Sequence, residues 1–288
     1  MGGFRARRRW RVAAVQMTST DQVDRNLDRA EVLVRRAAGA GADLVALPEN
    51  FAYLRSEGSE IQFRTDLDGE VVGRFREIAR EFGCHVLLGS VPERIRGSRR
   101  IHNTSVLADP EGEILAVYRK IHLFDVRIPG KIDFRESKTV VAGDRVVVAE
   151  TALGRLGMSI CYDLRFPELY RRLALAGAEV LLVPSAFTSY TGRFHWLPLL
   201  RARAIENLCW VVAPAQVGRH SETRASWGET AIVDPWGAVV ATLDRRQGWI
   251  ESEIDIERVR DARRGLPCLD HTRPELVGAP SRRGRRSR

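Results

Sequence analysis

The chain has few cysteines, and none of them is paired in sequence. Its 288 residues include only Cys84, Cys161, Cys209 and Cys268. No two stand in a Cys-x-x-Cys arrangement, which argues against a disulfide framework or a structural zinc site. We therefore expect reduced thiols and a cytoplasmic location.

Long apolar runs are also missing. No stretch approaches the ~20 uncharged apolar residues that span a bilayer, and the start, Met1–Arg5, lacks the apolar core of a signal peptide. We expect no association with membranes. The hydrophobic content of 44% is nevertheless enough for one large domain with a full core.

Lysine is almost absent. Among the 46 basic residues only Lys120, Lys131 and Lys138 are lysines, and all three fall within one short stretch. In a chain that otherwise uses arginine, this indicates a position that needs a compact ammonium whose pKa can be tuned. Chance clustering is the alternative for any one of them.

The net charge of +9 comes from the two ends of the chain. Ten arginines lie in terminal segments that contain no acid: Arg5, Arg7, Arg8, Arg9, Arg11, Arg282, Arg283, Arg285, Arg286 and Arg288. Without them the net charge would be −1, so the body of the chain is nearly neutral. We predict basic, disordered arms at 1–9 and 279–288, a folded domain over 10–278, and no specific nucleic-acid binding.

Helical and strand patterns alternate, and the second half of the chain repeats the first. In the first half, periodicity predicts helices over 26–38 and 73–82 and strands over 43–47 and 85–90. Residues 35–51 align without gaps with 171–187, so that a helix end, a glycine, a strand and a proline recur in order. The Asp-Pro-x-Gly turn at 109–112 recurs at 234–237.

This repeat predicts an α/β fold made of two similar halves. Each half would be a sheet covered by helices on one face, and the bare faces would pack together. The result is a four-layer α-β-β-α sandwich with an internal pseudo-two-fold repeat. A single open sheet with helices on both faces is the alternative, but it leaves the repeat unexplained. Residues 121–145 lack periodicity and are predicted to form a long irregular connection.

Three chemically complementary residues stand at predicted strand ends: Glu49, Lys120 and Cys161. Taken singly, the cysteine would more often be a small buried hydrophobe, and each charged residue a solvated one. Taken together, they supply a base, a cationic stabiliser and a nucleophile, which suffice for acyl transfer.

The chemistry needs no metal or other cofactor. A carboxylate at Glu49 could take the thiol proton and later protonate the leaving amine and activate water. Lys120 and the backbone N–H of Tyr162 could stabilise the oxyanion. The other three cysteines lack such charged settings, and we interpret them as structural.

Three segments carry a resemblance to a known family: 47–51, 118–125 and 160–168. They resemble the nitrilase superfamily of carbon–nitrogen hydrolases, whose signature is a Glu–Lys–Cys triad, and the resemblance runs from about residue 10 to about residue 278. It implies that Glu49 is the general base, Lys120 the stabiliser of the tetrahedral intermediate and Cys161 the nucleophile. It further implies a supporting role for Glu136, next to Lys120, and a homodimer.

Within the superfamily, Cys161-Tyr162-Asp163-Leu164-Arg165 looks like the amidase-type branch. The segments 184–188, 191–196, 200–207 and 213–220 resemble the deaminated glutathione amidases. This implies hydrolysis of a small carboxylate-bearing ω-amide, deaminated glutathione, through a thioester and with release of ammonia. The alternatives are an ω-amidase acting on α-ketoglutaramate, an N-carbamoyl amidohydrolase, or, outside the enzymes, a catalytically silent binding module.

Such a substrate requires a cationic residue near the thiol. Arg165 is our candidate for a carboxylate ligand, the alternative being a structural salt bridge to Glu168 or Asp163. Phe187 and His195 are further candidates for substrate binding, although His195, like its neighbour Trp196, could simply pack. One segment departs from the relatives, which usually have Gly-His-Ser where this chain has Gly228-Glu229-Thr230, so the resemblance leaves the fine substrate preference open.

Overall fold

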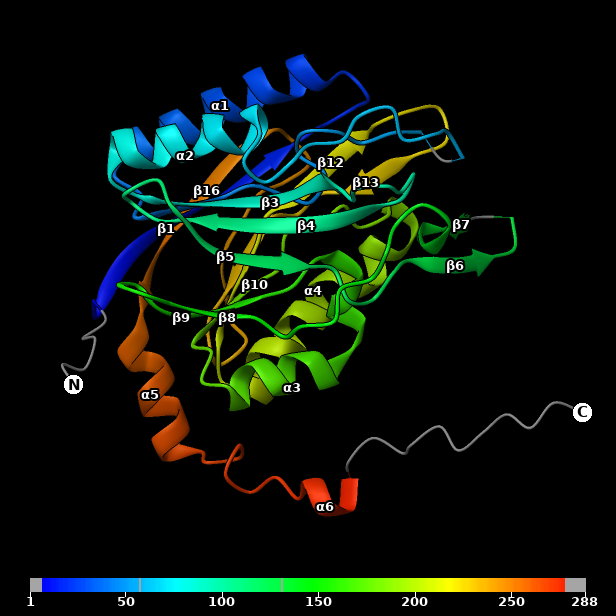
Figure 1. The fold of residues 1–288 in the computed structure, drawn as a ribbon. Helices are drawn as coiled ribbons and strands as arrows, with labels where there is room; N and C mark the ends of the chain where they lie inside the picture. Colours follow the sequence, from blue (N-terminus) through cyan, green and yellow to red (C-terminus); the bar gives the residue numbers. More distant parts are fainter. Residues whose placement is uncertain (1–6, 57, 131, 278–288) are drawn as a thin grey trace, which may run out of the picture.

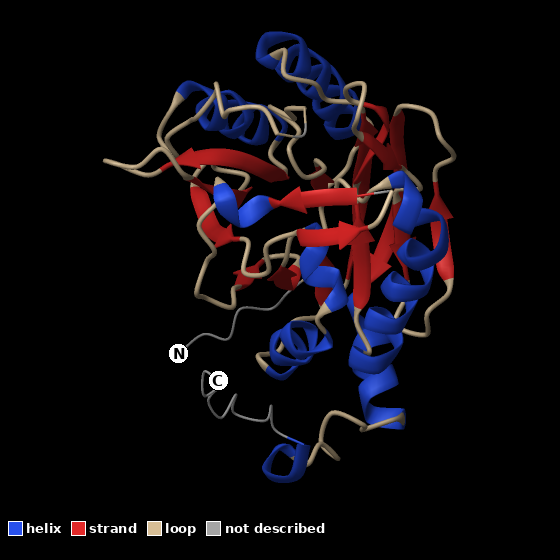
Figure 2. Cartoon of the chain, turned by 90° about the vertical axis from the view of Figure 1, so that its right-hand side faces the viewer, coloured by secondary structure: helices blue, strands red, loops and turns tan. Residues whose placement is uncertain are grey.

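Two β-sheets lie face to face with helices on both outer sides. The computed structural model describes residues 7–56, 58–130 and 132–277. Helices α1 (Val23–Gly39) and α2 (Glu70–Phe82) cover one sheet, and α3 (Pro167–Leu175) and α4 (Ser189–Asn207) cover the other (Figure 1). The view in Figure 2, turned by 90°, shows the same layers from the side. The predicted α-β-β-α sandwich is confirmed.

The larger sheet has the strand order β13-β12-β1-β2-β3-β4-β5, with β16 paired antiparallel to β1. Strands β1, β2 and β3 run parallel, whereas β3, β4 and β5 are antiparallel neighbours. The strand bounds are β1 Arg9–Met17, β2 Leu44–Ala46, β3 His85–Arg94, β4 Ile101–Ala108, β5 Ile114–Arg119, β12 Ala215–Arg219, β13 Ala225–Trp227 and β16 Gly248–Asp255.

The smaller sheet has the order β15-β14-β11-β10-β9-β8, with β9, β10 and β11 parallel. Its strands are β8 Val148–Thr151, β9 Gly154–Met158, β10 Val180–Leu182, β11 Trp210–Ala213, β14 Ala231–Val233 and β15 Val239–Thr242. Beyond the sandwich, α5 (Ile256–Gly265) and the short α6 (Pro274–Val277) lead away from it (Figure 1).

Strand β1 shows why its sequence is a continuous apolar run. Val12 and Ala14 belong to the core between the sheets, together with residues of β9 such as Leu156. Ala13 and Val15 point the other way and pack in the core under α1 and α2. Because side chains alternate along a strand, a strand covered on both faces needs apolar residues at every position.

The internal repeat is visible in the two Asp-Pro-x-Gly turns. The Oδ1 atom of Asp109 accepts hydrogen bonds from the backbone N–H groups two and four residues later, and Oδ1 of Asp234 does the same. Gly112 and Gly237 close the turns at φ +76° and +80°, where glycine alone is unstrained. Equivalent residues thus build equivalent hairpins in the two halves, as predicted.

The prediction of an irregular connection over 121–145 is wrong in part. An antiparallel hairpin of β6 (Asp125–Ile128) and β7 (Ile132–Arg135) lies there, followed by the 3₁₀ turn η1 (Glu136–Lys138). Charged and apolar residues do alternate in both strands, but over only four residues in each, and the prediction missed this short pattern. The hairpin delivers Glu136 to the site described below.

The described chain begins within the predicted basic arm. Arg7 forms an ion pair with Asp43 at 2.5 Å, and β1 starts at Arg9, which pairs with Asp255 at 3.0 Å. These arginines are therefore part of the folded body. Residues 1–6 and the predicted tail at 279–288 lie outside the described residues. Of the helices the structure describes, none is long and apolar enough to cross a membrane.

Candidate active site

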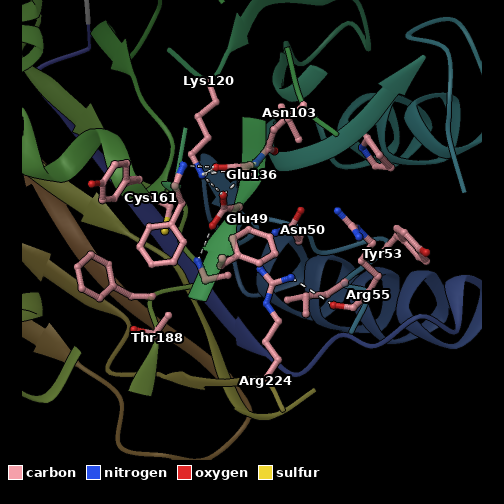
Figure 3. A pocket seen from close by; sticks show the side chains of 18 of the residues that line it. Glu49, Asn50, Tyr53, Arg55, Asn103, Lys120, Glu136, Cys161, Thr188 and Arg224 are labelled. Atoms are coloured by element: carbon pink, nitrogen blue, oxygen red, sulfur yellow. Dashed lines mark hydrogen bonds and ion pairs between the residues drawn. The ribbon is translucent and has the colours of Figure 1, made fainter. Parts of the chain in front are cut away.

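Three chain segments converge at one end of the sandwich. Glu49 follows β2, Lys120 directly follows β5, and Cys161 opens the 3₁₀ turn η2 (Cys161–Arg165) after β9. Figure 3 shows their side chains pointing toward one another in a cavity of about 910 Å³, its open mouth included. The structure thus brings together the three residues that the sequence placed at separate strand ends.

The backbone at Cys161 is held in a strained conformation. Its φ is +48°, in the left-handed region that residues other than glycine rarely adopt. The Cys161 N–H donates to the Pro184 carbonyl at 3.0 Å. The buried Asp163 carboxylate accepts from the Ile160 N–H at 2.9 Å and from the Tyr118 hydroxyl at 2.7 Å. These bonds fix the turn that presents the thiol.

Lys120 lies between two carboxylates. Its Nζ donates to Glu49 Oε1 at 2.9 Å and lies 3.0 Å from Glu136 Oε2. All three side chains are buried, with Lys120 only 2% exposed. An ammonium buried in this way is stable because two opposite charges surround it. Glu136 therefore lies where the resemblance implied, in direct contact with Lys120.

Asn103, on β4, is a site residue that the sequence reasoning missed. Its Nδ2 donates to Glu49 Oε1 at 2.9 Å and to Glu136 Oε1 at 3.3 Å, so it links the two carboxylates (Figure 3). The sequence offers little signal for it, because Asn103 stands between polar neighbours, His102 and Thr104, at the start of β4. Its burial, which costs free energy unless the amide is hydrogen-bonded, becomes clear only in the structure.

Backbone N–H groups complete the carboxylate environment. The Ala186 N–H donates to Glu49 Oε2 at 2.8 Å, and the Phe124 N–H donates to Glu136 Oε2 at 2.6 Å. Both donors come from loops, one in each half of the repeat. These backbone donors fix the orientation of both carboxylates.

The charges at the site set its protonation state. Burial would raise the pKa of Glu49, but the ammonium of Lys120 outweighs it and holds that pKa below its usual value. Burial would likewise lower the pKa of Lys120, but the charges of Glu136 and Glu49 raise it. Burial and then the charge of Glu49 raise the pKa of the Cys161 thiol well above its usual value.

The resting site therefore holds a neutral thiol, a carboxylate and an ammonium. Glu49 is the group next to Cys161 that can accept its proton as a bond to carbon forms. Lys120 Nζ can donate to a developing oxyanion. Tyr162 lies at the start of η2, where a helix leaves backbone N–H groups without intrahelical partners, so its N–H can provide a second donor.

Two of the predicted substrate-binding residues line the cavity, and one does not. Arg165 and Phe187 are on its wall, and the Arg165 guanidinium lies 4.9 Å from the Phe187 ring centroid. His195, on α4, is exposed and outside the cavity lining, and its Nδ1 lies 3.2 Å from Arg165 Nη1. Trp196 is fully buried and packs against Phe187.

The alternative role of Arg165, a structural salt bridge, is not seen. In the described chain its guanidinium forms no ion pair with Glu168 or Asp163, and the Asp163 carboxylate is instead bonded to His122 and Tyr118. Arg165 is thus a half-buried cation on the cavity wall. Two further cavity arginines, Arg55 and Arg224, were not anticipated from the sequence.

Glu229, where the chain departs from the resembling sequences, lies outside the cavity lining. Its backbone has φ +56°, and its carbonyl accepts a hydrogen bond from the Trp196 indole at 2.7 Å. This hydrogen bond comes from the backbone and does not depend on the side chain at position 229, so the departure changes no residue of the cavity lining.

The other cysteines are free thiols away from the site. Burial raises the pKa of both Cys84 and Cys209 to about 11, and Cys268 is only partly buried. A thiol with so high a pKa is a poor nucleophile without a neighbouring base. Cys209 does lie beside a charged group, since Arg263 Nη2 is 3.0 Å from its Sγ, which the sequence did not indicate. The structural role of the three cysteines stays a prediction.

Comparisons with known proteins give the family. The family model for carbon–nitrogen hydrolases matches residues 11–264. A deaminated glutathione amidase of Synechocystis is 44% identical over 262 residues, which cover 90% of this chain and 96% of that protein. Relatives of this kind act on small-molecule amides.

Solved structures agree. The structure of the C. elegans NitFhit protein superposes with a TM-score of 0.86 at 39% identity, covering 94% of this chain and 66% of that one. A second solved structure is a mutant of the amidase from Nesterenkonia, in which the acetamide moiety of fluoroacetamide is covalently added at the active-site cysteine. It superposes with a TM-score of 0.78 at 27% identity, and the match covers 96% of this chain and 98% of that one. The chain therefore belongs to the carbon–nitrogen hydrolase family of the nitrilase superfamily, and it is a hydrolase of amide carbon–nitrogen bonds.

Proposed function

We propose that this hydrolase acts on a small ω-amide that carries a carboxylate, deaminated glutathione, through a thioester on Cys161. The observation that carries the proposal is the cavity itself. A thiol, a carboxylate and an ammonium meet in it, and a half-buried arginine, Arg165, faces it without a carboxylate partner in the described chain. The 44% identical Synechocystis relative, a deaminated glutathione amidase, supports this choice of substrate.

Acylation begins at the substrate carbonyl carbon. Sγ of Cys161 attacks it while Glu49 takes the thiol proton, and the oxygen becomes negatively charged. Lys120 Nζ and the Tyr162 N–H hydrogen-bond this oxyanion. Glu49 then passes its proton to the substrate nitrogen, the carbon–nitrogen bond breaks, and the amine leaves.

Deacylation uses the same groups in reverse order. Glu49 takes a proton from a water molecule, whose oxygen attacks the thioester carbon, and the carbon–sulfur bond breaks as Cys161 regains a proton. Glu136 and Asn103 keep Lys120 and Glu49 in place through both steps, because Glu136 pairs with Lys120, and Asn103 donates to both Glu49 and Glu136.

The leaving group depends on the substrate. Deaminated glutathione contains only peptide amides, so its hydrolysis releases an amine. Ammonia, the product expected from a primary ω-amide, would be released from α-ketoglutaramate. An assay of the protein must therefore detect both products.

Arg165 is proposed to bind the carboxylate of the acyl part. It belongs to the same 3₁₀ turn as Cys161, and a guanidinium can bind a carboxylate through two parallel hydrogen bonds. Phe187 supplies an apolar wall beside it. His195 is proposed to orient Arg165 through the contact at 3.2 Å, from outside the cavity.

The proposal is tested by steady-state kinetics on three substrates: deaminated glutathione, α-ketoglutaramate and an N-carbamoyl amino acid. We expect the highest kcat/KM for the first, and no turnover by Cys161→Ala. A higher value for either of the others would transfer the assignment to an ω-amidase or an N-carbamoyl amidohydrolase. If the parent and Cys161→Ala are equally silent on all three, the binding-module alternative gains.

We also propose a homodimer formed through α4. Phe194, Leu197 and Ile205 follow one another at helical spacing on one face of α4, and Gly237, the neighbour of Trp236 in the chain, lies against Ile205. Phe194, Ile205 and Trp236 are 55%, 46% and 60% exposed, which is unusual for large apolar side chains that gather in one place. Light scattering should give a dimer for the parent and for the control Val32→Glu, on α1, but a monomer for Phe194→Glu.

A cytoplasmic location is part of the same proposal. The mechanism requires Cys161 as a reduced thiol, and all four cysteines of the chain are free. A reducing compartment maintains that state. Fractionation of cells that express the chain with a detectable tag would test the location directly.

A further inference from the structure

Two arginines in the cavity have no part in the chemistry described so far. Arg55 lies in the loop between β2 and α2, and Arg224 lies in the loop between β12 and β13. Both line the same cavity as Cys161, and both are partly buried. Figure 3 shows them next to each other, joined by the hydrogen bond from Arg224 Nη1 to the Arg55 carbonyl at 3.2 Å.

Their guanidinium groups contact neutral partners. Arg55 donates to the Thr139 hydroxyl at 2.8 Å and to the Ser59 carbonyl. The Arg224 guanidinium lies over the Phe134 ring, 5.5 Å from its centroid. Among residues 7–56, 58–130 and 132–277, neither guanidinium forms an ion pair with a carboxylate. Two positive charges thus share one side of the cavity without an ion-pair partner among the described residues, although the charge of Glu136 acts on Arg55 from a distance.

Their proximity has an electrostatic cost. Burial and then the positive charge of Arg224 lower the pKa of Arg55, although an arginine remains protonated under all ordinary conditions. A bound anion would relieve this repulsion and use the free N–H donors at the same time. Elsewhere in the described chain many arginines do pair with acids, for example Arg119 with Glu93 at 2.5 Å, so the unpaired state at the cavity is not a general property of the surface.

The position of the pair indicates which part of a substrate it would meet. Arg165 belongs to the turn that carries Cys161, which bonds to the acyl carbon. Arg55 belongs to the same loop as Glu49, which protonates the leaving nitrogen in the proposed mechanism. The acyl group and the leaving amine must lie toward these two loops, respectively.

We propose that Arg55 and Arg224 form a second carboxylate subsite, which binds a carboxylate carried by the amine leaving group. This inference rests on the proposed function and extends it. The substrate class becomes an amide with a carboxylate at each end, one for Arg165 and one for the Arg55–Arg224 pair. A primary ω-amide has no leaving-group carboxylate and would leave this subsite empty.

The test compares two substrates that differ only in that carboxylate. One is deaminated glutathione, and the other is its analogue in which the terminal glycine is replaced by ethylamine. We expect the parent to prefer the acid in kcat/KM by about 10- to 100-fold, mainly through KM, as for a charge-assisted pair of hydrogen bonds. Arg224→Gln and Arg55→Gln should lose this preference and keep their activity on the ethylamide analogue within about threefold.

Arg219→Gln is the matched control, because Arg219 lies in the preceding strand β12, is exposed and does not line the cavity. It should keep the parent's preference. Arg224→Lys should restore part of it. The subsite is refuted if the parent hydrolyses both substrates equally well, or if Arg224→Gln loses activity on both to the same degree.

Binding measurements separate this inference from the proposed function. In a Cys161→Ala background, calorimetry should show tighter binding of the acid than of the ethylamide, and this difference should vanish on adding Arg224→Gln. If the parent turns over neither compound, the proposed function fails, while the subsite is still decided by these affinities. Equal affinities, or no binding of either ligand, would overturn it.

Discussion

Asn103 illustrates how one neutral side chain can organise several charges. Its amide group donates to the carboxylates of both Glu49 and Glu136, which also flank Lys120. Its Oδ1 has no hydrogen-bond partner in the described chain. The Asn103 amide therefore acts as a donor that fixes the positions of the Glu49 and Glu136 carboxylates relative to each other.

Replacement of Asn103 by Ala should lower kcat while the chain stays folded. Two charge-assisted hydrogen bonds are lost, which corresponds to a decrease of about 10- to 100-fold. The effect should fall on kcat more than on KM, because Asn103 positions the groups that transfer protons. Steady-state kinetics measures the split, and circular dichroism checks the fold. A change in KM alone would argue for a role in substrate binding.

The protonation state of Cys161 gives a second prediction at this scale. Since burial and the charge of Glu49 raise the pKa of the thiol, Cys161 should remain protonated at neutral pH, and its thiolate should form only above pH 9. The thiolate absorbance in the ultraviolet, taken as the difference between the parent and Cys161→Ala, should be absent at neutral pH. A thiolate signal there would contradict the role of Glu49 as proton acceptor.

At the level of elements, β3 supports the loop that carries Glu49. Gly89 lies so close to this loop that a Cβ atom would come within 2.0 Å of the Leu47 carbonyl oxygen and 2.3 Å of that of Pro48. The backbone after β2 can therefore reach its position only if residue 89 has no side chain.

Gly89→Ala should consequently displace the Pro48–Glu49 segment, reduce activity strongly and lower stability by about 1–3 kcal/mol, the usual cost of overpacking. Gly73→Ala is the matched control, because Gly73 lies within α2 and a Cβ there would meet nothing within 4 Å. That variant should gain about 0.5–1 kcal/mol from helix propensity. Activity assays and thermal unfolding of both proteins test the pair, and an active Gly89→Ala would be inconsistent with the close approach.

The elements also explain which features could be predicted from the sequence. The helices, the buried strands and the repeat have periodic apolar patterns and glycine or proline stops, which are local signals. The triad of Glu49, Lys120 and Cys161 could be predicted because each member follows an apolar run. Asn103, Arg55 and Arg224 could not be predicted, because their significance comes from contacts between segments far apart in sequence. The β6–β7 hairpin does alternate charged and apolar residues, but over only four residues in each strand, which is too short a signal to separate it from the surrounding loop.

For the molecule as a whole, the residues of the catalytic cavity and the residues that carry the excess positive charge lie in different parts of the chain. The cavity residues lie between Glu49 and Arg224, whereas most of the excess positive charge lies at the chain ends. Catalysis and any attraction to polyanions should therefore be independent.

Deletion of residues 279–288 should leave kcat/KM unchanged and weaken binding to a polyanion such as heparin. The remaining affinity should fall steeply as salt rises, because binding of this kind depends on the release of counterions. Heparin chromatography and amidase assays on the full and truncated chains measure both. A drop in kcat/KM on truncation would show that the tail contributes to the site.

The repeat described above also bears on the history of the chain. In the gapless alignment of 35–51 with 171–187, Glu49 corresponds to Ser185, whose buried hydroxyl donates to the Val183 carbonyl at 3.0 Å. The Ala186 N–H, next to that serine, donates to Glu49 itself. If the halves arose by duplication, they have specialised: one retains an acid, and the other retains a loop that supports it. Neither half now contains a complete active site. Each chain should therefore carry only one acyl group, on Cys161.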